Sequence, residues 1–259
     1  MCFDNHKFPP YRRTLYLLLW LEHKHSLSRF IDKYYLGGNC SSVIINSKGD
    51  KLSTRFITGD KNLLGELHMT GWDFDKADLG VYNTEQLIKL LSVLSENISM
   101  NLTKAGDKAV SLKISDTNSD VNYMLSDLSV ISSPPNLKSI PDFEVKIKVD
   151  KSFMTKFVAG KGALADTDNF TVITSDDGVK IVIGYAEINT NRVTLPVETE
   201  SYDKIENVSF NANLFRDVLI ANKECESATL EVSSGGLARI NFKIDEYDAT
   251  YYLVADTDV

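Results

Sequence analysis

The sequence is poor in the residues that carry catalysis, metal binding and cross-linking. Only three cysteines occur among 259 residues, and Cys2, Cys40 and Cys225 lie far apart, with no Cys-x-x-Cys pair. Such spacing excludes a zinc ribbon or a disulfide framework and is typical of reduced thiols inside a cell. Of the four histidines, only His68 lies outside the N-terminal 25 residues. A histidine-dependent catalytic triad therefore has little to draw on.

Phosphate-binding loops and metal-binding clusters are missing as well. Neither G-x-x-x-x-G-K-[ST] nor G-x-G-x-x-G occurs, and the Gly-Lys-Gly run at 160–162 falls at the end of an expected helix, where a C-terminal cap is favoured over a nucleotide site. Aspartates cluster at 73–78 and at 166–168, but their spacing does not fit a calcium-binding loop. We therefore expect no enzyme activity, no catalytic residue, no cofactor and no metal.

Long hydrophobic runs and a basic charge balance are also absent. The most apolar run, residues 15–21, has seven residues, too few to cross a bilayer, and no small-residue cleavage site follows it. With 36 acidic against 28 basic residues, the formal net charge is -8. That balance excludes a simple basic nucleic-acid binder, so any contact with DNA must be confined to a local surface. We expect neither secretion nor a membrane span.

What the chain does contain is an internal repeat at an offset of 127 to 129 residues. Ser-Arg-Phe-Ile at 28–31 parallels Thr-Lys-Phe-Val at 155–158. Near the end of each half, Asn-Tyr-Met-Leu at 122–125 parallels Thr-Tyr-Tyr-Leu at 250–253. The positions of Val81, Leu87 and Leu91 fall 127 residues before those of three further apolar residues, Val208, Leu214 and Val218. A nearly constant offset over about a hundred residues predicts two domains of one design.

The repeat and the composition together predict where the domains begin and end. We expect an N-terminal extension of uncertain structure at 1–25, a first domain at 26–131, a Pro/Ser-rich connector at 132–141 and a second domain at 142–259. Each domain should contain a helix, two or three strands, a second helix and three more strands. The predicted fold class is α+β, with two helices packed on antiparallel sheets in each domain.

The polar faces of the four expected helices carry mostly basic side chains. Acidic residues on these faces are limited to Asp32 and Glu85, although acids exceed bases in the whole chain. For any single helix a solvated polar face is the simpler explanation. If the four helices line one concave surface, however, their bases could follow DNA phosphates without reading the base sequence. The predicted DNA-facing residues are Arg29, Lys33, Lys89, Lys151, Lys156, Arg216 and Lys223.

Residues 26–259 resemble the sliding clamps of T-even-type bacteriophages in the order, the spacing and the duplication of their sequence segments. The segments most similar to that family are 30–54, 72–94, the connector to 141, and Tyr-Tyr-Leu-Val-Ala-Asp at 251–256. The resemblance implies duplicated DNA-clamp domains that assemble into a homotrimeric ring around double-stranded DNA, with the helices inside. It also implies that DNA polymerase, the clamp loader and phage late transcription factors dock on the outer face, in the cytoplasm of the infected bacterial host. The chain departs from the family at its start, because family chains begin shortly before the first helix.

The resemblance also implies a place for partner peptides, between the two domains, beneath the connector and near the last strand. The matching apolar candidates are Val130, Ile131, Leu137, Ile140 and Val254, for which plain interdomain packing is an equal explanation. A β-rich phage structural or scaffold protein with duplicated domains is the alternative function. An enzyme is a third possible function, but it would need a cleft of ionisable groups, and no pattern in the sequence indicates one. Retention on circular DNA but not on linear DNA would separate a clamp from a scaffold.

Overall fold

The computed structural model describes residues 23–137, 139–188 and 190–256, so most of the predicted N-terminal extension lies outside the described residues. In the first half of the chain the two helices are each followed by antiparallel strands. The elements are α2 (His23–Tyr35), β1 (Val43–Ser47), β2 (Lys51–Ile57), β3 (Leu63–Thr70), β4 (Ala77–Val81), α3 (Thr84–Val93), β5 (Ser99–Ala105), β6 (Lys108–Ser115) and β7 (Asp120–Met124).

The second half repeats this order and has one further strand before its second helix, while most of the residues that correspond to its first strand lie outside the described part of the chain. Short 3-10 turns follow α2 and β7, at Leu36–Gly38 and Leu128–Val130. The elements of the second half are β8 (Val145–Asp150), α4 (Lys151–Ala163), β9 (Asn169–Ser175), β10 (Gly178–Ile183), β11 (Val193–Val197), β12 (Thr199–Tyr202), β13 (Val208–Asn211), α5 (Ala212–Ala221), β14 (Ser227–Ser233), β15 (Leu237–Ile244) and β16 (Tyr247–Val254). The described part therefore has the predicted α+β fold, with four strands rather than two or three between the helices of its first half.

The second helix of each half begins in the same way. The Asn83 side chain accepts a hydrogen bond from the backbone N–H of Gln86 at 2.9 Å, and the Asn211 side chain accepts one from Leu214 at 2.9 Å. An asparagine at this position satisfies one of the backbone donors that the first helical turn leaves free. The two caps place α3 and α5 at an offset of 128, one residue more than the hydrophobic pattern predicted.

The described strands form three sheets, and the largest joins the two halves of the chain. Its order is β12-β8-β14-β15-β16-β3-β2-β1-β4, so the last described strand completes the sheet of the first half. The antiparallel pairing of β16 with β3 runs from Tyr247 opposite Met69 to Leu253 opposite Leu63. The other sheets have the orders β11-β10-β9-β13 and β5-β6-β7.

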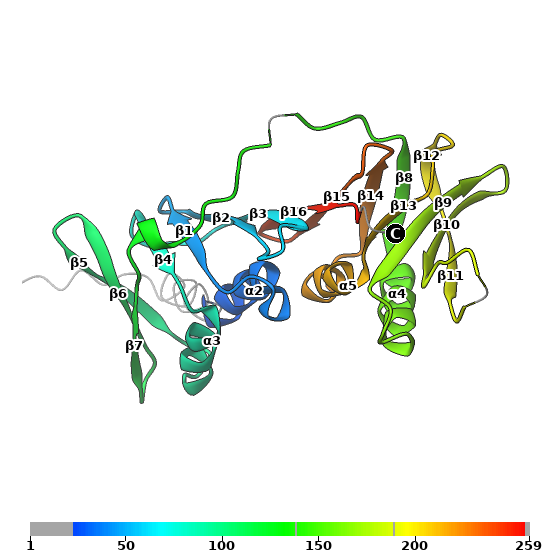
Figure 1. Ribbon diagram of the computed structural model, residues 1–259. Helices are drawn as coiled ribbons and strands as arrows, with labels where there is room; N and C mark the ends of the chain where they lie inside the picture. The colour runs from blue at the N-terminus through cyan, green and yellow to red at the C-terminus, as the bar shows by residue number, and fades with distance from the viewer. Residues whose placement is uncertain (1–22, 138, 189, 257–259) are drawn as a thin grey trace, which may run out of the picture.

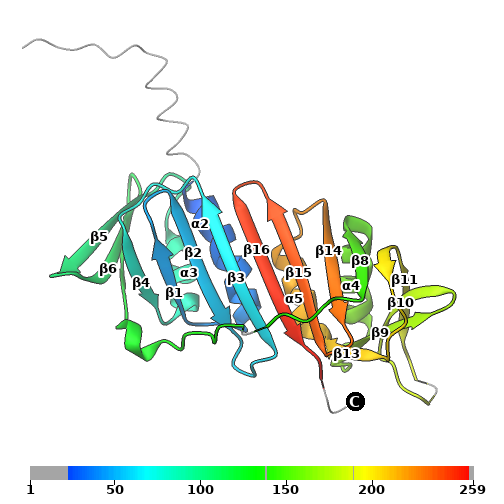
Figure 2. The ribbon, with the colours of Figure 1, turned by 90° about the horizontal axis from the view of Figure 1, so that it is seen from above.

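The helices and the connector lie on opposite faces of the nine-stranded sheet. Figure 1 shows α3, α2, α5 and α4 side by side below the sheet, while the segment that joins β7 to β8 arches above it. Figure 2, seen from above, shows the same segment crossing the outer face of the strands. One face of the molecule is therefore helical, and the other carries the connector.

Aromatic side chains hold the helices to the sheets. In the second half the Phe157 ring meets the rings of Phe170 and Phe215 edge to face, with centroids 5.3 and 4.9 Å apart. In the first half the Phe56 ring packs over Gly65, where a Cβ atom would lie 2.0 Å from the ring carbon Cζ. The glycine in β3 is therefore required by the close approach of this ring, because any side chain there would overlap it.

Candidate DNA-facing surface and sheet edges

Five of the seven predicted DNA-facing side chains are accessible on the helical face. Lys89, Lys151, Lys156 and Lys223 are exposed, and Arg216 is half-buried. They come from α3, α4, α5 and the turn after α5, which Figure 1 places along the same side of the sheet. The structure thus brings bases from both halves of the chain onto one face.

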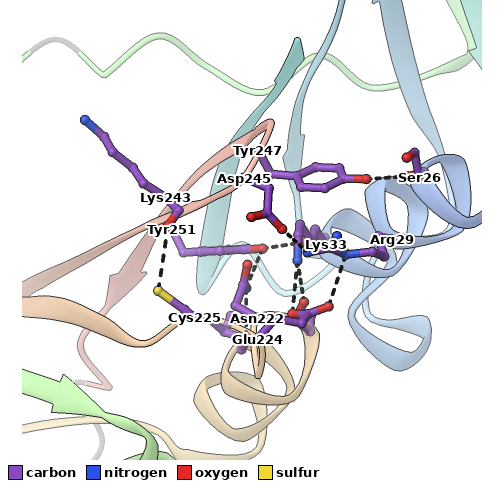
Figure 3. Close-up of polar contacts among 12 residues, drawn as sticks. Ser26, Arg29, Lys33, Asn222, Glu224, Cys225, Lys243, Asp245, Tyr247 and Tyr251 are labelled. Carbon is purple, nitrogen blue, oxygen red and sulfur yellow. Dashed lines mark hydrogen bonds and ion pairs between the residues drawn. The ribbon is translucent and has the colours of Figure 1, made fainter. Parts of the chain in front are cut away.

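The other two predicted residues, Arg29 and Lys33, lie where α2 meets the second half of the chain. Figure 3 shows both directed toward Glu224. The Lys33 side chain has 0% exposed surface, its Nζ donates a hydrogen bond to the carbonyl oxygen of Ala221 at 2.8 Å, and it lies 3.6 Å from a carboxylate oxygen of Glu224. Lys33 has no surface left to offer to a DNA phosphate in this structure.

Arg29 completes what we call the charged junction, formed by Arg29, Lys33, Glu224 and Tyr247. Its Nε lies 3.3 Å from a carboxylate oxygen of Glu224, and its guanidinium carbon lies 4.8 Å from the centre of the Tyr247 ring. Sequence reasoning missed Glu224 and Tyr247, because no motif marks them. Their positions, two residues after the cap of α5 and at the first residue of β16, become informative only when the two halves are packed together.

Burial controls the charges of the junction. It lowers the pKa of Lys33, while the attraction of Glu224 opposes that change. Burial would raise the pKa of Glu224, but a backbone hydrogen bond and the positive charges of Lys33 and Arg29 outweigh it, so the pKa falls below its usual value. The carboxylate therefore stays ionised at neutral pH and keeps the buried ammonium paired.

Several accessible bases are partly neutralised within their own chain. Lys89 pairs with Glu85 at 2.5 Å and Lys151 with Glu226 at 2.5 Å. Arg216 pairs at 2.8 Å with its neighbour Asp217, an acid that the sequence analysis did not place on these faces. Among the described residues, Lys156 and Lys223 have no carboxylate oxygen within 4.0 Å. Any attraction for phosphate is thus modest and local.

Six described strands, β4, β5, β7, β11, β12 and β13, lie at the edge of a sheet, and two of them, β7 and β11, lie toward opposite ends of the molecule. Within the described ranges, β7 pairs only with β6, and β11 pairs only with β10. Beside β11 lies a hollow of about 780 Å³, whose walls come from β8, α4, β11, β12 and β14. An unpaired strand edge offers a row of backbone donors and acceptors to another chain.

The predicted partner-binding residues are divided by the structure. Val130, Leu137, Ile140 and Val254 are exposed, whereas Ile131 is buried. The connector between them is fastened to the sheet, because the guanidinium of Arg55 donates hydrogen bonds to Asn136 Oδ1 at 2.7 Å and to the carbonyl oxygen of Pro135 at 2.9 Å.

The described residues show no sign of metal chemistry. They include no group of three or more His, Cys, Asp or Glu side chains placed to hold a metal ion. The Gly-Lys-Gly run lies in the last turns of α4, where Lys161 Nζ donates to the carbonyl oxygens of Leu164 and Ala165 at 3.2 and 2.9 Å. Its ammonium therefore caps a helix. No helix in the described ranges is long and apolar enough to cross a membrane.

Comparison with known proteins identifies the fold. No protein-family model and no curated protein matches the chain in sequence. The structure is similar to the crystal structure of the proliferating cellular nuclear antigen from Entamoeba histolytica, a sliding clamp, with a TM-score of 0.69 and 15% sequence identity. The similarity covers 90% of this chain and 96% of that one. The chain has the fold of a sliding clamp.

Proposed function

We propose that this protein is the sliding clamp of a T-even-type bacteriophage, a non-enzymatic ring that encircles double-stranded DNA and tethers the replicative DNA polymerase. The observation that carries the proposal is the pair of free edges, β7 and β11. Within the chain, β16 pairs with β3, and β7 and β11 hold the corresponding places in the two smaller sheets. A head-to-tail contact that repeats the β16–β3 pairing between copies would close a ring.

The internal repeat predicts the register of that contact. Leu67 of β3 lies opposite Thr54, and Leu195 of β11 lies opposite Ile181. Because Ile181 is the counterpart of Thr54 at the repeat offset of 127, Leu195 is the counterpart of Leu67. In β16 the residue that faces Leu67 is Ala249. The matching registers of β15–β16 and β6–β7 make Val121 of β7 the counterpart of Ala249. We therefore expect Val121 to face Leu195 of the next copy. Three copies would bring six similar domains around one duplex, as the resemblance implies.

In such a ring the helical face lines the hole, and Lys89, Lys151, Arg216 and Lys223 face the DNA, whereas Lys156 lies in the hollow beside the edge strand β11. Their contacts would be with phosphates, independent of base sequence and sensitive to salt. Because three of these bases have acidic partners within the chain and the net charge is -8, contact alone should be weak. Retention on DNA then depends on encirclement.

The outer face is where partners would bind. Val130, Leu137, Ile140 and Val254 offer exposed apolar surface beside the connector, on the face away from the helices. DNA polymerase, the clamp loader and phage late transcription factors are the partners that the resemblance implies, in the cytoplasm of the infected bacterium. Ile131 is excluded from this proposed surface because it is buried.

The experiment is to load the protein on closed circular DNA with its clamp loader, remove free protein, and cut the circle once. We expect the protein to co-elute with the intact circle at moderate salt and to leave the linear product. Light scattering should give a solution mass near three times 29.0 kDa. Equal retention on both DNA forms would show gripping rather than encirclement. If the protein assembles but is lost equally from circular and linear DNA, the result would favour the scaffold alternative.

A further inference from the structure

The hollow beside β11 contains a cation with no partner among the described residues. Lys156 projects from α4 at this end of the molecule, with Phe153, Leu195 and Ala228 among the other lining residues. The side chain is exposed, and no described carboxylate lies within the 4.0 Å of an ion pair. This end is also where β11 presents its free edge.

Lys156 has a counterpart whose partner is known. At the repeat offset of 127 it corresponds to Arg29, one residue before Phe157 just as Arg29 is one residue before Phe30. Arg29 reaches across the charged junction to Glu224, which stands two residues after Asn222, the C-terminal cap of α5. The contact joins the first helix of one domain to the loop that follows the second helix of the other.

The same loop in the first half ends in an acid. Glu96 stands two residues after Leu94, the C-terminal cap of α3, and is therefore the counterpart of Glu224. Its side chain is 69% exposed, and its contact with Lys24 is long, at 3.8 Å. An accessible carboxylate thus lies at one end of the molecule, and an accessible ammonium lies at the other.

Given the ring proposed above, on which this inference rests, we propose that Lys156 of one copy pairs with Glu96 of the next copy in the hollow beside β11. The contact between copies, here called the subunit seam, would reproduce the Arg29–Glu224 contact with a lysine in place of the arginine. This pair forms only when the end with Glu96 meets the end with Lys156, so it favours the head-to-tail orientation even though Asp150, Glu198 and Glu200 also line the hollow.

The subunit seam lacks the buried part of the charged junction. The counterpart of Lys33 is Gly160, where a Cβ atom would already lie 3.0 Å from Val193, and the counterpart of Tyr247 is Ser119. The buried ammonium and the tyrosine ring of the charged junction therefore have no counterparts at the subunit seam. The subunit seam therefore depends on an ion pair open to solvent, which salt screens. It should separate at lower salt than the junction within the chain.

The test is a charge swap read by sedimentation velocity over a concentration series. Lys156→Glu and Glu96→Lys should each raise the concentration at which half the trimer dissociates by roughly tenfold or more. Combining the two substitutions should return it to within roughly threefold of wild type. The matched control is Lys151→Glu, the same charge change on the same helix at a residue that pairs with Glu226 of its own chain.

The outcomes distinguish this pair from the ring itself. Circular dichroism should show that all variants fold like the wild type, because both residues are exposed. Lys156→Met keeps the side-chain stem without the charge and should weaken the trimer less than Lys156→Glu. If the wild type is a trimer and Lys156→Glu weakens it no more than Lys151→Glu does, the ion pair is refuted and the ring is not. The same conclusion follows if the double variant dissociates as readily as the single variants. A wild type that stays monomeric, also after loading, would overturn the ring and the pair together.

Discussion

Replacing Lys33 by methionine tests whether the buried ammonium stabilises the contact between the two halves. Methionine keeps an unbranched apolar stem that can fill the same space. The change removes the hydrogen bond to the Ala221 carbonyl oxygen and the 3.6 Å ion pair with Glu224. A hydrogen bond from a charged donor is worth about 1.5–3 kcal/mol, and the carbonyl left behind would be buried without that donor.

The structure limits the loss to that range. Glu224 is 35% exposed and keeps Arg29 at 3.3 Å, so it does not become the isolated buried charge that costs about 3–5 kcal/mol. We expect Lys33→Met to lower the free energy of unfolding by about 1.5–3 kcal/mol in urea titrations followed by circular dichroism. Lys89→Met, at an exposed position, serves as the control and should leave stability unchanged. Indistinguishable stabilities of the two variants would refute a stabilising role for the buried ammonium.

Three further outcomes follow from local geometry. Gly65→Ala should destabilise the protein by about 3 kcal/mol in urea titrations, because the new methyl group would overlap the Phe56 ring. Asn83→Ala and Asn211→Ala should each cost about 1 kcal/mol in the same titrations, equal within error, since the two caps are alike. The pKa of Asp116 is lowered to about 2 by backbone N–H donors, so carbon NMR should find its midpoint there. Its contribution to stability should be complete above its ordinary value of 3.8 and fall away as the pH drops toward 2.

The overall arrangement was predictable because it depends on periodic patterns that survive in each half separately. The constant offset and the apolar stripes of the helices predicted two similar units and four helices. The described part of the chain contains four helices, and the order of its elements largely repeats in the two halves. The asparagine caps could have refined the offset, since Asn83 and Asn211 both precede apolar helices. The pairing of the strands was harder to predict, because a short apolar run does not show which strand lies beside it.

The candidate surface was only partly predictable, because a helical projection shows which side chains avoid the nearest sheet and nothing beyond it. Lys33 lies off the apolar stripe of α2, as predicted, yet it is fully buried, and its ammonium contacts the end of α5 and Glu224 beyond it. Ala221, the last residue of α5, is 188 residues away from Lys33, so no local pattern could reveal the contact. Ile131 is buried for a similar reason, packing near Gly80 beneath the start of the connector.

The pairing of β16 with β3 also has a consequence for synthesis on the ribosome. Because β3 pairs with β16, it keeps an open edge until Tyr247–Val254 has left the exit tunnel, long after the rest of the first half has been made. Contacts so distant in sequence form slowly, and an open edge can accept a strand from another molecule. Two nascent chains on one messenger could therefore exchange their final strands, giving a swapped dimer in which each chain completes its neighbour's sheet.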